Sequence, residues 1–345
     1  MTLELLWFCL IGFFWAGYFV LEGFDFGVGM LLPWVPKDES ERGVLLRTIG
    51  PVWDGNEVWL VVAGAATFAA FPAWYATMFS GFYLALLLVL VLLIVRVVSF
   101  EWRGKGDGVA WRGTWLAANV VGSVGAPLVW GIALSNLVQG VPLDGDGHYA
   151  GTFADLFSPY TVAAGVTVVA LFAFHGALFL TLRTSGELLT RVTAAARALS
   201  IPAVLLGAGF VAWTVAVAVD RNDKDVLPAA LPAAVVVVAL LAAAWLVRSG
   251  RTGGAFAATA VGIVGAVATI FVSLYPRVLV SSPDFANSLT VSGAASEHYT
   301  LAVMSVVTLI VLPLVLLYQG WTYLVFRGRL TGEDTIGEAF APRAR

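Results

Sequence analysis

Nine long apolar runs occupy most of this 345-residue chain and leave it few ways to fold. Each run has about 20 residues or more, the length that a helix needs to cross about 30 Å of hydrocarbon. The runs are Leu3–Leu32, Pro51–Phe71, Thr77–Phe100, Thr114–Gln139, Pro159–Leu182, Ala198–Val219, Leu227–Val247, Ala255–Tyr275 and Tyr299–Phe326. They lack the apolar and polar alternation of barrel strands, so we predict an all-α polytopic membrane protein with nine transmembrane helices.

The charge content supports the same class. Only 12% of the residues are charged, whereas a soluble domain carries about 25%. The connections are too short to form a soluble domain, so we predict a single integral membrane domain over residues 1–345, with a polar tail from about residue 328 to 345. The helix count favours two four-helix bundles plus one extra helix. The net charge of −3 argues against a nucleic-acid partner.

Lysine and arginine residues predict the orientation of the helices. Fifteen lie after the first, third, fifth and seventh runs or in the C-terminal tail, three lie in the other connections, and Arg96 lies inside the third run. Cytoplasmic loops of membrane proteins carry such an excess of cations. We therefore expect the N-terminus outside and the C-terminus in the cytoplasm. The loop over residues 140–158 contains aspartates but no lysine or arginine, as an external loop would.

Two pairs of acidic residues lie inside the predicted helices. Glu22 and Asp25 are near the end of the first run, and Asp54 and Glu57 are near the start of the second. The i, i+3 spacing places each pair on one helix face. The predicted orientation puts all four in the cytoplasmic half of the membrane. Because ionisable groups are costly there, they commonly mark an ion or proton route, which is the function that we favour for them.

A structural explanation of these acids remains open beside the functional one. Pro51 is well suited to the first position of a helix, and carboxylates in the next turns are stabilised by the helix dipole. Stabilising the start of this helix can be the whole role of Asp54 and Glu57. Glu22 can pair with a cation such as Arg47 or Arg96.

Two further polar side chains lie within the apolar runs. Arg96 can neutralise the acids, or it can extend to the membrane interface, as arginine often does. His175 is the only histidine well inside a run, where it can relay protons, ligate haem or simply be hydrogen-bonded. Haem ligation by two histidines requires a second one at similar depth, and His148 and His298 both lie towards the external side. We therefore expect no haem or metal site in this chain.

Five segments resemble subunit II of the cytochrome bd quinol oxidases. They are Gly23–Leu31, Gly50–Trp59, Phe79–Leu84, Leu182–Leu188 and Gln319–Tyr323. The segment that contains Trp53, Asp54, Gly55 and Asn56 is specific, whereas the Gly-Phe-Asp-Phe-Gly string alone would be weak. The resemblance follows the whole chain in order, and the number of helices agrees.

The resemblance implies a bacterial terminal oxidase in the plasma membrane that oxidises quinol and reduces oxygen to water. It implies that haem b, haem d and the quinol site belong to subunit I, the larger partner in a heterodimer. The chain itself would bind no haem and would stabilise the complex, with membrane lipid and quinone around it and room for a small single-helix subunit. Ubiquinol and menaquinol both remain as substrates of the complex.

The resemblance also implies a role for the acids. In the family a proton conduit from the cytoplasm lies at the contact between the subunits. Asp25 and Asp54 match its acidic positions, Glu22 matches a position that is often acidic, and Glu57 stands where relatives can have a neutral amide. Trp53, Arg96 and His175 are candidates for supporting residues.

Two other functions compete with a proton-supplying oxidase subunit. An ion-coupled secondary transporter would also use buried acids, but transporters place their sites near the midplane of the membrane. Here the acids lie towards one face, which disfavours a transporter. A purely structural anchor would use the acids for assembly alone.

Overall fold

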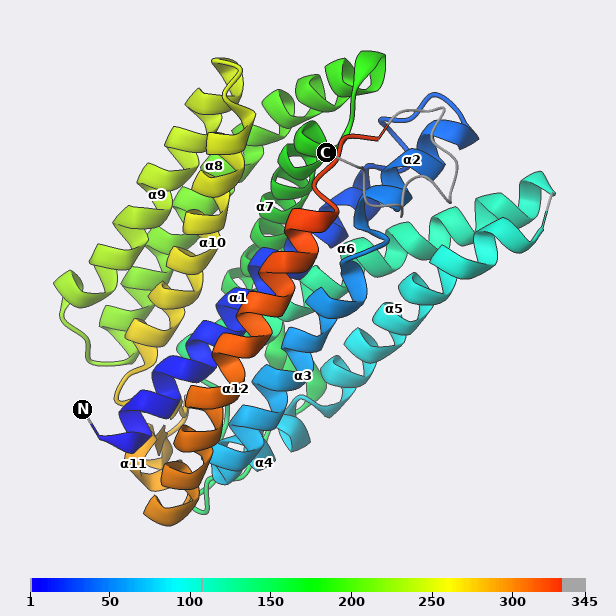
Figure 1. Cartoon of the computed structure of the whole chain (residues 1–345). Helices are drawn as coiled ribbons and strands as arrows, with labels where there is room; N and C mark the ends of the chain where they lie inside the picture. Colours follow the sequence, from blue (N-terminus) through cyan, green and yellow to red (C-terminus); the bar gives the residue numbers. More distant parts are fainter. Residues whose placement is uncertain (1, 107, 331–345) are drawn as a thin grey trace.

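The computed structural model describes residues 2–106 and 108–330 as a helical bundle with one short hairpin (Figure 1). The helices are α1 (Leu3–Leu31), α2 (Glu39–Ile49), α3 (Trp53–Ala70), α4 (Pro72–Gly81), α5 (Tyr83–Trp102), α6 (Val109–Gln139), α7 (Pro159–Arg183), α8 (Gly186–Arg221), α9 (Val226–Arg248), α10 (Thr252–Leu274), α11 (Val291–Ala294) and α12 (His298–Val325). Strand β1 (Arg277–Leu279) pairs antiparallel with β2 (Leu289–Thr290). Most of the predicted polar tail, residues 331–345, lies outside the described residues.

Eight helices in the described part of the chain are long and apolar enough to cross a membrane. They are α1, α5, α6, α7, α8, α9, α10 and α12. Helix α3 coincides with the second predicted run, but Asp54, Asn56 and Glu57 lie near its start and it is not among the eight. The prediction of an all-helical polytopic membrane protein is confirmed at this level.

The helices differ from the predicted runs in three places. The third run is divided, because α4 ends at Gly81 and α5 begins only at Tyr83. The connection after the first run contains α2, whose N-cap Asp38 accepts a hydrogen bond from the backbone N–H of Glu41. Helix α8 begins at Gly186, twelve residues before the predicted start at Ala198. A search for apolar runs overlooks α2 and the start of α8 because both are polar.

Helix α1 occupies the centre of the bundle and packs against α3, α6, α7 and α10. Its contact with α7 is a direct approach of two backbones. A Cβ atom on Gly27 would lie 2.0 Å from the carbonyl oxygen of Phe172 and 2.8 Å from the Cα atom of Gly176. Small residues allow membrane helices to come this close. Burying α1 on several sides places the polar residues of its second half inside the protein.

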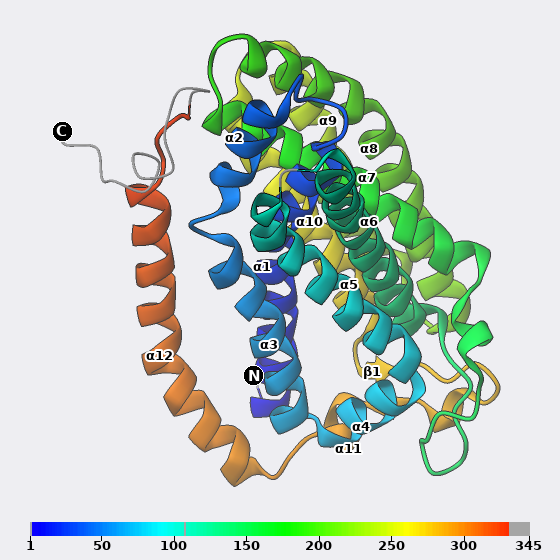
Figure 2. The same ribbon diagram turned by 90° about the vertical axis from the view of Figure 1, so that its right-hand side faces the viewer.

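Helix α12 stands beside the bundle (Figure 2). Along this helix, all of which the structure describes, Leu301 is the only buried residue. The indole N–H of Trp7 donates to the Leu301 carbonyl at 3.2 Å and to the Ser305 hydroxyl at 3.0 Å, which fastens the first half of α12. A cavity of about 580 Å³ separates α12 from α3, and another of about 950 Å³ separates it from α1 and α10.

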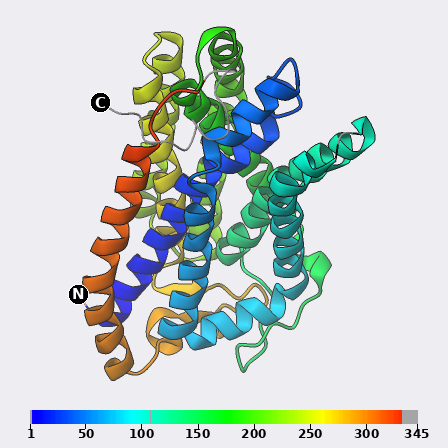
Figure 3. The same ribbon diagram turned by 45° about the vertical axis from the view of Figure 1, so that its right-hand side comes forward.

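The bundle has two distinct ends. We call one the α2 end, where α2 and the α7–α8 and α9–α10 connections lie, and the other the α11 end, where α4, α11 and the hairpin lie (Figure 1). Ion pairs join α2 to its neighbours at the α2 end, among them Glu41 with Arg191 of α8 and Glu39 with Arg103 after α5. The paired helices α5 and α6, drawn in cyan and blue-green, extend sideways at this end (Figure 3).

The approach of α1 to α7 generates the first prediction. Gly27→Ala should lower the free energy of unfolding by about 1–3 kcal/mol, because the added methyl group meets backbone atoms that cannot move aside. Thermal denaturation of the purified protein in detergent measures the change. Gly64→Ala in α3 is the matched control, since a Cβ atom there meets nothing within 4 Å. Equal melting temperatures for the two variants would contradict the proposed backbone contact.

Candidate functional site

The structure separates the four acids into a buried pair and a pair at the surface of the bundle. Glu22 and Asp25 of α1 are completely inaccessible to solvent. Asp54, near the start of α3, is exposed and lines the cavity of about 580 Å³ between α3 and α12. Glu57 is half-buried one turn further along α3. All four lie in the half of the bundle towards the α2 end, near the end of α1 and the start of α3.

Arg96 of α5 is fully buried and forms an ion pair with Glu22. Its Nη1 atom donates to Glu22 Oε1, and its guanidinium carbon lies 4.5 Å from the ring centroid of Phe26. Gly122 of α6 makes room for this side chain, because a Cβ atom there would lie 2.6 Å from the Arg96 Cβ atom. The alternative in which Arg96 extends to the membrane interface is therefore wrong, and its pairing with the acidic cluster is confirmed.

Asp25 is held by an amide from α3. Its Oδ2 atom accepts a hydrogen bond of 2.7 Å from Asn56 Nδ2. The Asn56 side-chain oxygen in turn accepts from the hydroxyl of Tyr323 at 2.6 Å and from Gln319 Nε2 at 3.2 Å, both in α12. Asn56, Gln319 and Tyr323 were not predicted as site residues from the sequence. The available signal was that all three lie in segments that carry the family resemblance.

Several buried polar atoms of this cluster have no hydrogen-bond partner among the described residues. They are the Tyr18 hydroxyl, Glu22 Oε2, Asp25 Oδ1, and Nε and Nη2 of Arg96. Buried polar groups in proteins are normally satisfied by protein atoms or by ordered water, and internal waters collect where several such groups converge. The unpartnered atoms converge between α1 and α5, next to the two carboxyls.

The charge of the buried cluster explains what it can do. Two carboxyls and one guanidinium are removed from solvent together. If both Glu22 and Asp25 were ionised, the cluster would keep an uncompensated negative charge in a medium of low dielectric, which is costly. With one proton on the pair, the charge is balanced. The cluster is therefore suited to accept a proton and to release it.

The two remaining supporting candidates have different surroundings. Trp53 is half-buried, and its ring packs against Phe100 with 5.6 Å between the centroids. His175 of α7 is fully buried; its Nδ1 atom is 2.6 Å from the Thr259 hydroxyl and its Nε2 atom is 3.1 Å from the Val20 carbonyl oxygen. Both ring nitrogens of His175 are engaged, so the residue does not fit an axial ligand of haem iron. Its surroundings match the interpretation of a satisfied polar group.

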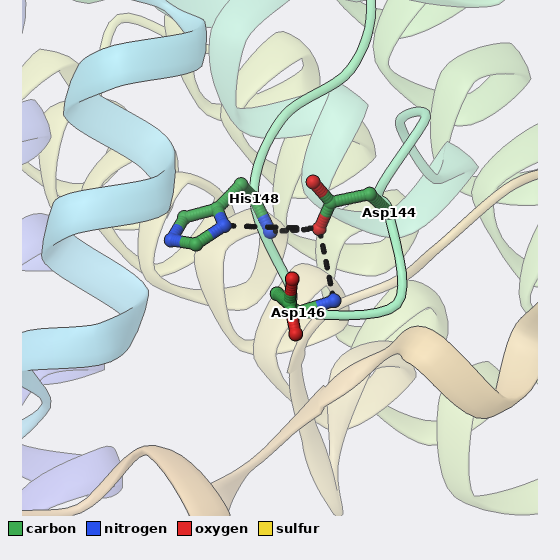
Figure 4. A group of neighbouring side chains, drawn as sticks. All are labelled: Asp144, Asp146 and His148. Atoms are coloured by element: carbon green, nitrogen blue, oxygen red, sulfur yellow. Dashed lines mark hydrogen bonds and ion pairs between the residues drawn. The ribbon is translucent and has the colours of Figure 1, made fainter.

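A second group of charged residues lies in the connection between α6 and α7. Asp144, Asp146 and His148 are exposed, and their side chains approach one another within 4.8 Å (Figure 4). Asp144 Oδ1 accepts hydrogen bonds from the backbone N–H groups of Asp146 at 3.0 Å and of His148 at 2.8 Å. These bonds close a turn and account for the proximity of the three side chains. We assign no ligand to this loop.

The buried ion pair generates the second prediction. Arg96→Met should lower the free energy of unfolding by about 3–5 kcal/mol, because it leaves Glu22 buried without its partner. The double variant Arg96→Met, Glu22→Gln should recover much of this loss, which a double-mutant cycle on thermal stability measures. Lys37→Met is the control, since its ion pair with Glu187 is exposed and such pairs contribute at most about 1 kcal/mol. Additive losses in the double variant would exclude a direct interaction.

Known proteins resemble this chain over almost its full length. Residues 3–326 match the family described as cytochrome bd terminal oxidase subunit II. Cytochrome bd ubiquinol oxidase subunit 2 of Bacillus subtilis is 41% identical, over 96% of this chain and 98% of the relative. Cytochrome bd-I ubiquinol oxidase subunit 2 of Escherichia coli strain K12 is 36% identical, over 96% of each chain.

A solved structure shares the fold. A chain of the bd oxidase from Geobacillus thermodenitrificans superposes with a TM-score of 0.74, covering 94% of this chain and 99% of that one, at 21% sequence identity. At this identity the likeness concerns the fold alone, whereas the match over residues 3–326 and the two relatives define the family. The chain therefore belongs to the family of cytochrome bd terminal oxidase subunit II.

Proposed function

We propose that this chain supplies protons from the cytoplasm, through Asp54, Asp25 and Glu22, to the haem-bearing partner of a bd-type quinol oxidase. Its family makes it a subunit of a terminal oxidase complex in a bacterial membrane. The proton route through these residues is the part that we propose. The observation that carries it is a buried carboxyl pair with one balancing arginine, joined through Asn56 to the cavity that Asp54 lines.

The route begins at the cavity between α3 and α12. Asp54 is exposed there and lines the cavity. Asp25 and Glu22 lie deeper, and the cluster that they form with Arg96 holds one proton at charge balance. When oxygen reduction in the partner consumes protons, the cluster would release its proton towards the partner. Asp54 would then help to reprotonate the cluster. Glu57, half-buried within the electrostatic influence of Arg96, is an auxiliary member of the route.

Electron transfer is assigned to the partner. The relatives named above are subunits of oxidases, so a subunit I accompanies this chain. We propose that haem b and haem d are bound by subunit I, because His175 is fully engaged in hydrogen bonds, while His148 and His298 belong to the loops and helix start of the α11 end. Quinol, as ubiquinol or menaquinol, would be oxidised by the same partner. A small single-helix subunit and membrane lipid complete the proposed surroundings.

The arrangement in the membrane is part of the proposal. We propose that α3 also crosses the bilayer, which makes nine spans in a single membrane domain. Helices α1, α3, α5 and α6 would form one four-helix unit, α7 to α10 a second, and α12 an extra helix. The packing of α7 on α8, of α8 on α9 and of α9 on α10 supports the second unit. The lysines and arginines at the α2 end support a cytoplasmic position for that end.

The proposed orientation predicts a labelling pattern. In a Cys9→Ser background, Ser282→Cys at the α11 end should react with a membrane-impermeant maleimide applied to intact cells. Ser40→Cys in α2 should react only after the membrane is opened. Both serines are exposed in the structure, so neither result depends on unfolding. The opposite pattern would place the α2 end outside and remove the cytoplasmic route.

The route predicts the effect of neutralising its first carboxyl. Asp54→Asn should lower oxygen consumption per haem by at least about tenfold, in line with the contribution of a proton-transferring side chain. The membrane potential generated by the purified complex in liposomes should fall with it. Asp146→Asn, an exposed change in the α6–α7 loop, is the control.

The same experiment separates the proposal from its alternatives. Wild-type turnover and potential in Asp54→Asn would exclude this residue from the route. A structural anchor predicts less assembled complex in the variant but unchanged turnover per haem. The relatives lend no support to a secondary transporter.

A further inference from the structure

We propose that Trp59, Gln319 and Asn56 form an orienting chain that presents an N–H donor to Asp25. Each residue in this series of hydrogen bonds determines on which side the next carboxamide places its oxygen and its nitrogen. The inference deepens the proposed function and rests on it for the role of Asp25 in proton supply. It makes Asn56, Gln319 and Tyr323 positioning residues, which act through Asp25 and transfer no proton themselves.

The orienting chain of hydrogen bonds begins at Trp59 of α3, whose indole N–H can donate but not accept. This group donates to Gln319 Oε1 at 2.7 Å. The indole is held in place by α1, because a Cβ atom on Gly17 would lie 2.4 Å from the ring. A fixed donor on one side of Gln319 selects the carboxamide orientation with oxygen towards Trp59 and nitrogen towards Asn56.

The next link is the carboxamide of Asn56. Its oxygen accepts from Gln319 Nε2 at 3.2 Å and from the Tyr323 hydroxyl at 2.6 Å. Two donors on the oxygen direct the Asn56 nitrogen to the opposite side. There it meets two acceptors, Asp25 Oδ2 at 2.7 Å and the Leu21 carbonyl oxygen at 3.4 Å.

The reverse orientation of the Asn56 carboxamide would be unfavourable for both its oxygen and its nitrogen. Its oxygen would face the oxygens of Asp25 and Leu21, and its nitrogen would face the donor group of Gln319. A buried polar atom left without a partner has lost its hydrogen bond to water and gained none in return, which is unfavourable. The two donors and two acceptors around Asn56 therefore agree on one orientation of its carboxamide, and Trp59 determines the direction of the orienting chain.

The orienting chain gives α12 a role beyond packing, because two of its side chains hold Asn56. This helix contributes little buried surface to the described structure, yet Gln319 and Tyr323 are the side chains that hold Asn56. Asn56, Gln319 and Tyr323 all line the 580 Å³ cavity that also reaches Asp54. Asn56 thus lies both in the wall of this cavity and in contact with the buried Asp25 carboxyl.

The test uses the complete oxidase complex and an infrared signature. The carboxyl band of Asp25 is defined as the band that disappears in Asp25→Asn. Tyr323→Phe and Gln319→Leu should shift this band and lower turnover per haem roughly three- to tenfold, the effect of losing one positioning hydrogen bond. Gln319→Glu keeps the size of the side chain and its acceptor for Trp59, and as an ionised carboxylate it loses the donor to Asn56. It should therefore shift the band as Gln319→Leu does.

Tyr318→Phe is the matched control. It makes the same chemical change on the same helix and lines the same cavity, but the described structure gives the Tyr318 hydroxyl no hydrogen bond. Its band and turnover should equal those of the wild type. Haem content verifies assembly, and if Gln319→Leu fails to assemble, Tyr323→Phe, which removes a single oxygen atom, decides the test.

The outcomes distinguish this inference from the proposed function. An unshifted band with normal turnover in Tyr323→Phe and Gln319→Glu overturns the orienting chain, even if Asp25→Asn abolishes turnover. If Asp25→Asn keeps wild-type turnover, the proton route fails, while a shifted band in Tyr323→Phe still supports the chain. Equal shifts in Tyr323→Phe and Tyr318→Phe would also overturn it, since the effect would then lack the predicted specificity.

Discussion

The buried ion pair of Glu22 with Arg96 is the interaction on which the site depends. Two oppositely charged groups with no exposure to solvent tolerate burial only because they neutralise each other. The pair joins α1 to α5 and leaves Asp25 as the carboxyl that is not matched by a cation. That imbalance makes the cluster suited to exchanging a proton. Close contacts at glycines bring α7 against α1 and α6 against α5. This close packing helps to bury the cluster.

Much of the fold could be predicted because lipid imposes one rule on every crossing segment. Runs of about 20 apolar residues without the alternation of barrel strands form helices, because within lipid only helices and closed barrels satisfy the backbone hydrogen bonds. The rule does not reach α2 or the first turns of α8, which lie among charged residues and depend on ion pairs such as Glu41 with Arg191. It also does not show that Gly81 and Tyr83 belong to separate helices, because the sequence stays apolar across that junction.

The site was predictable only as far as charge identifies residues. Glu22, Asp25, Asp54 and Glu57 are conspicuous in apolar surroundings, and pairing of Glu22 with Arg96 was one of the options that their depth allowed. The exposure of Asp54 against the burial of Asp25 was not predictable, because it depends on which face of α3 meets α12. Asn56, Gln319 and Tyr323 carry no charge, and Gln319 and Tyr323 are more than 260 residues from Asn56 in sequence, so only the folded structure brings them together.

The early start of α8 affects the whole α2 end. A helix of 36 residues is about 54 Å long at 1.5 Å per residue, well beyond the thickness of hydrocarbon. The length exceeds what a perpendicular crossing requires, and the polar leading turns of α8 carry Arg191, which ties α2 to α8 through its ion pair with Glu41. The short turn that leads from α2 into α3 contributes Pro51 and Val52 to the lining of the cavity beside Asp54. The ion pair between α2 and α8 therefore helps to hold one wall of that cavity in place.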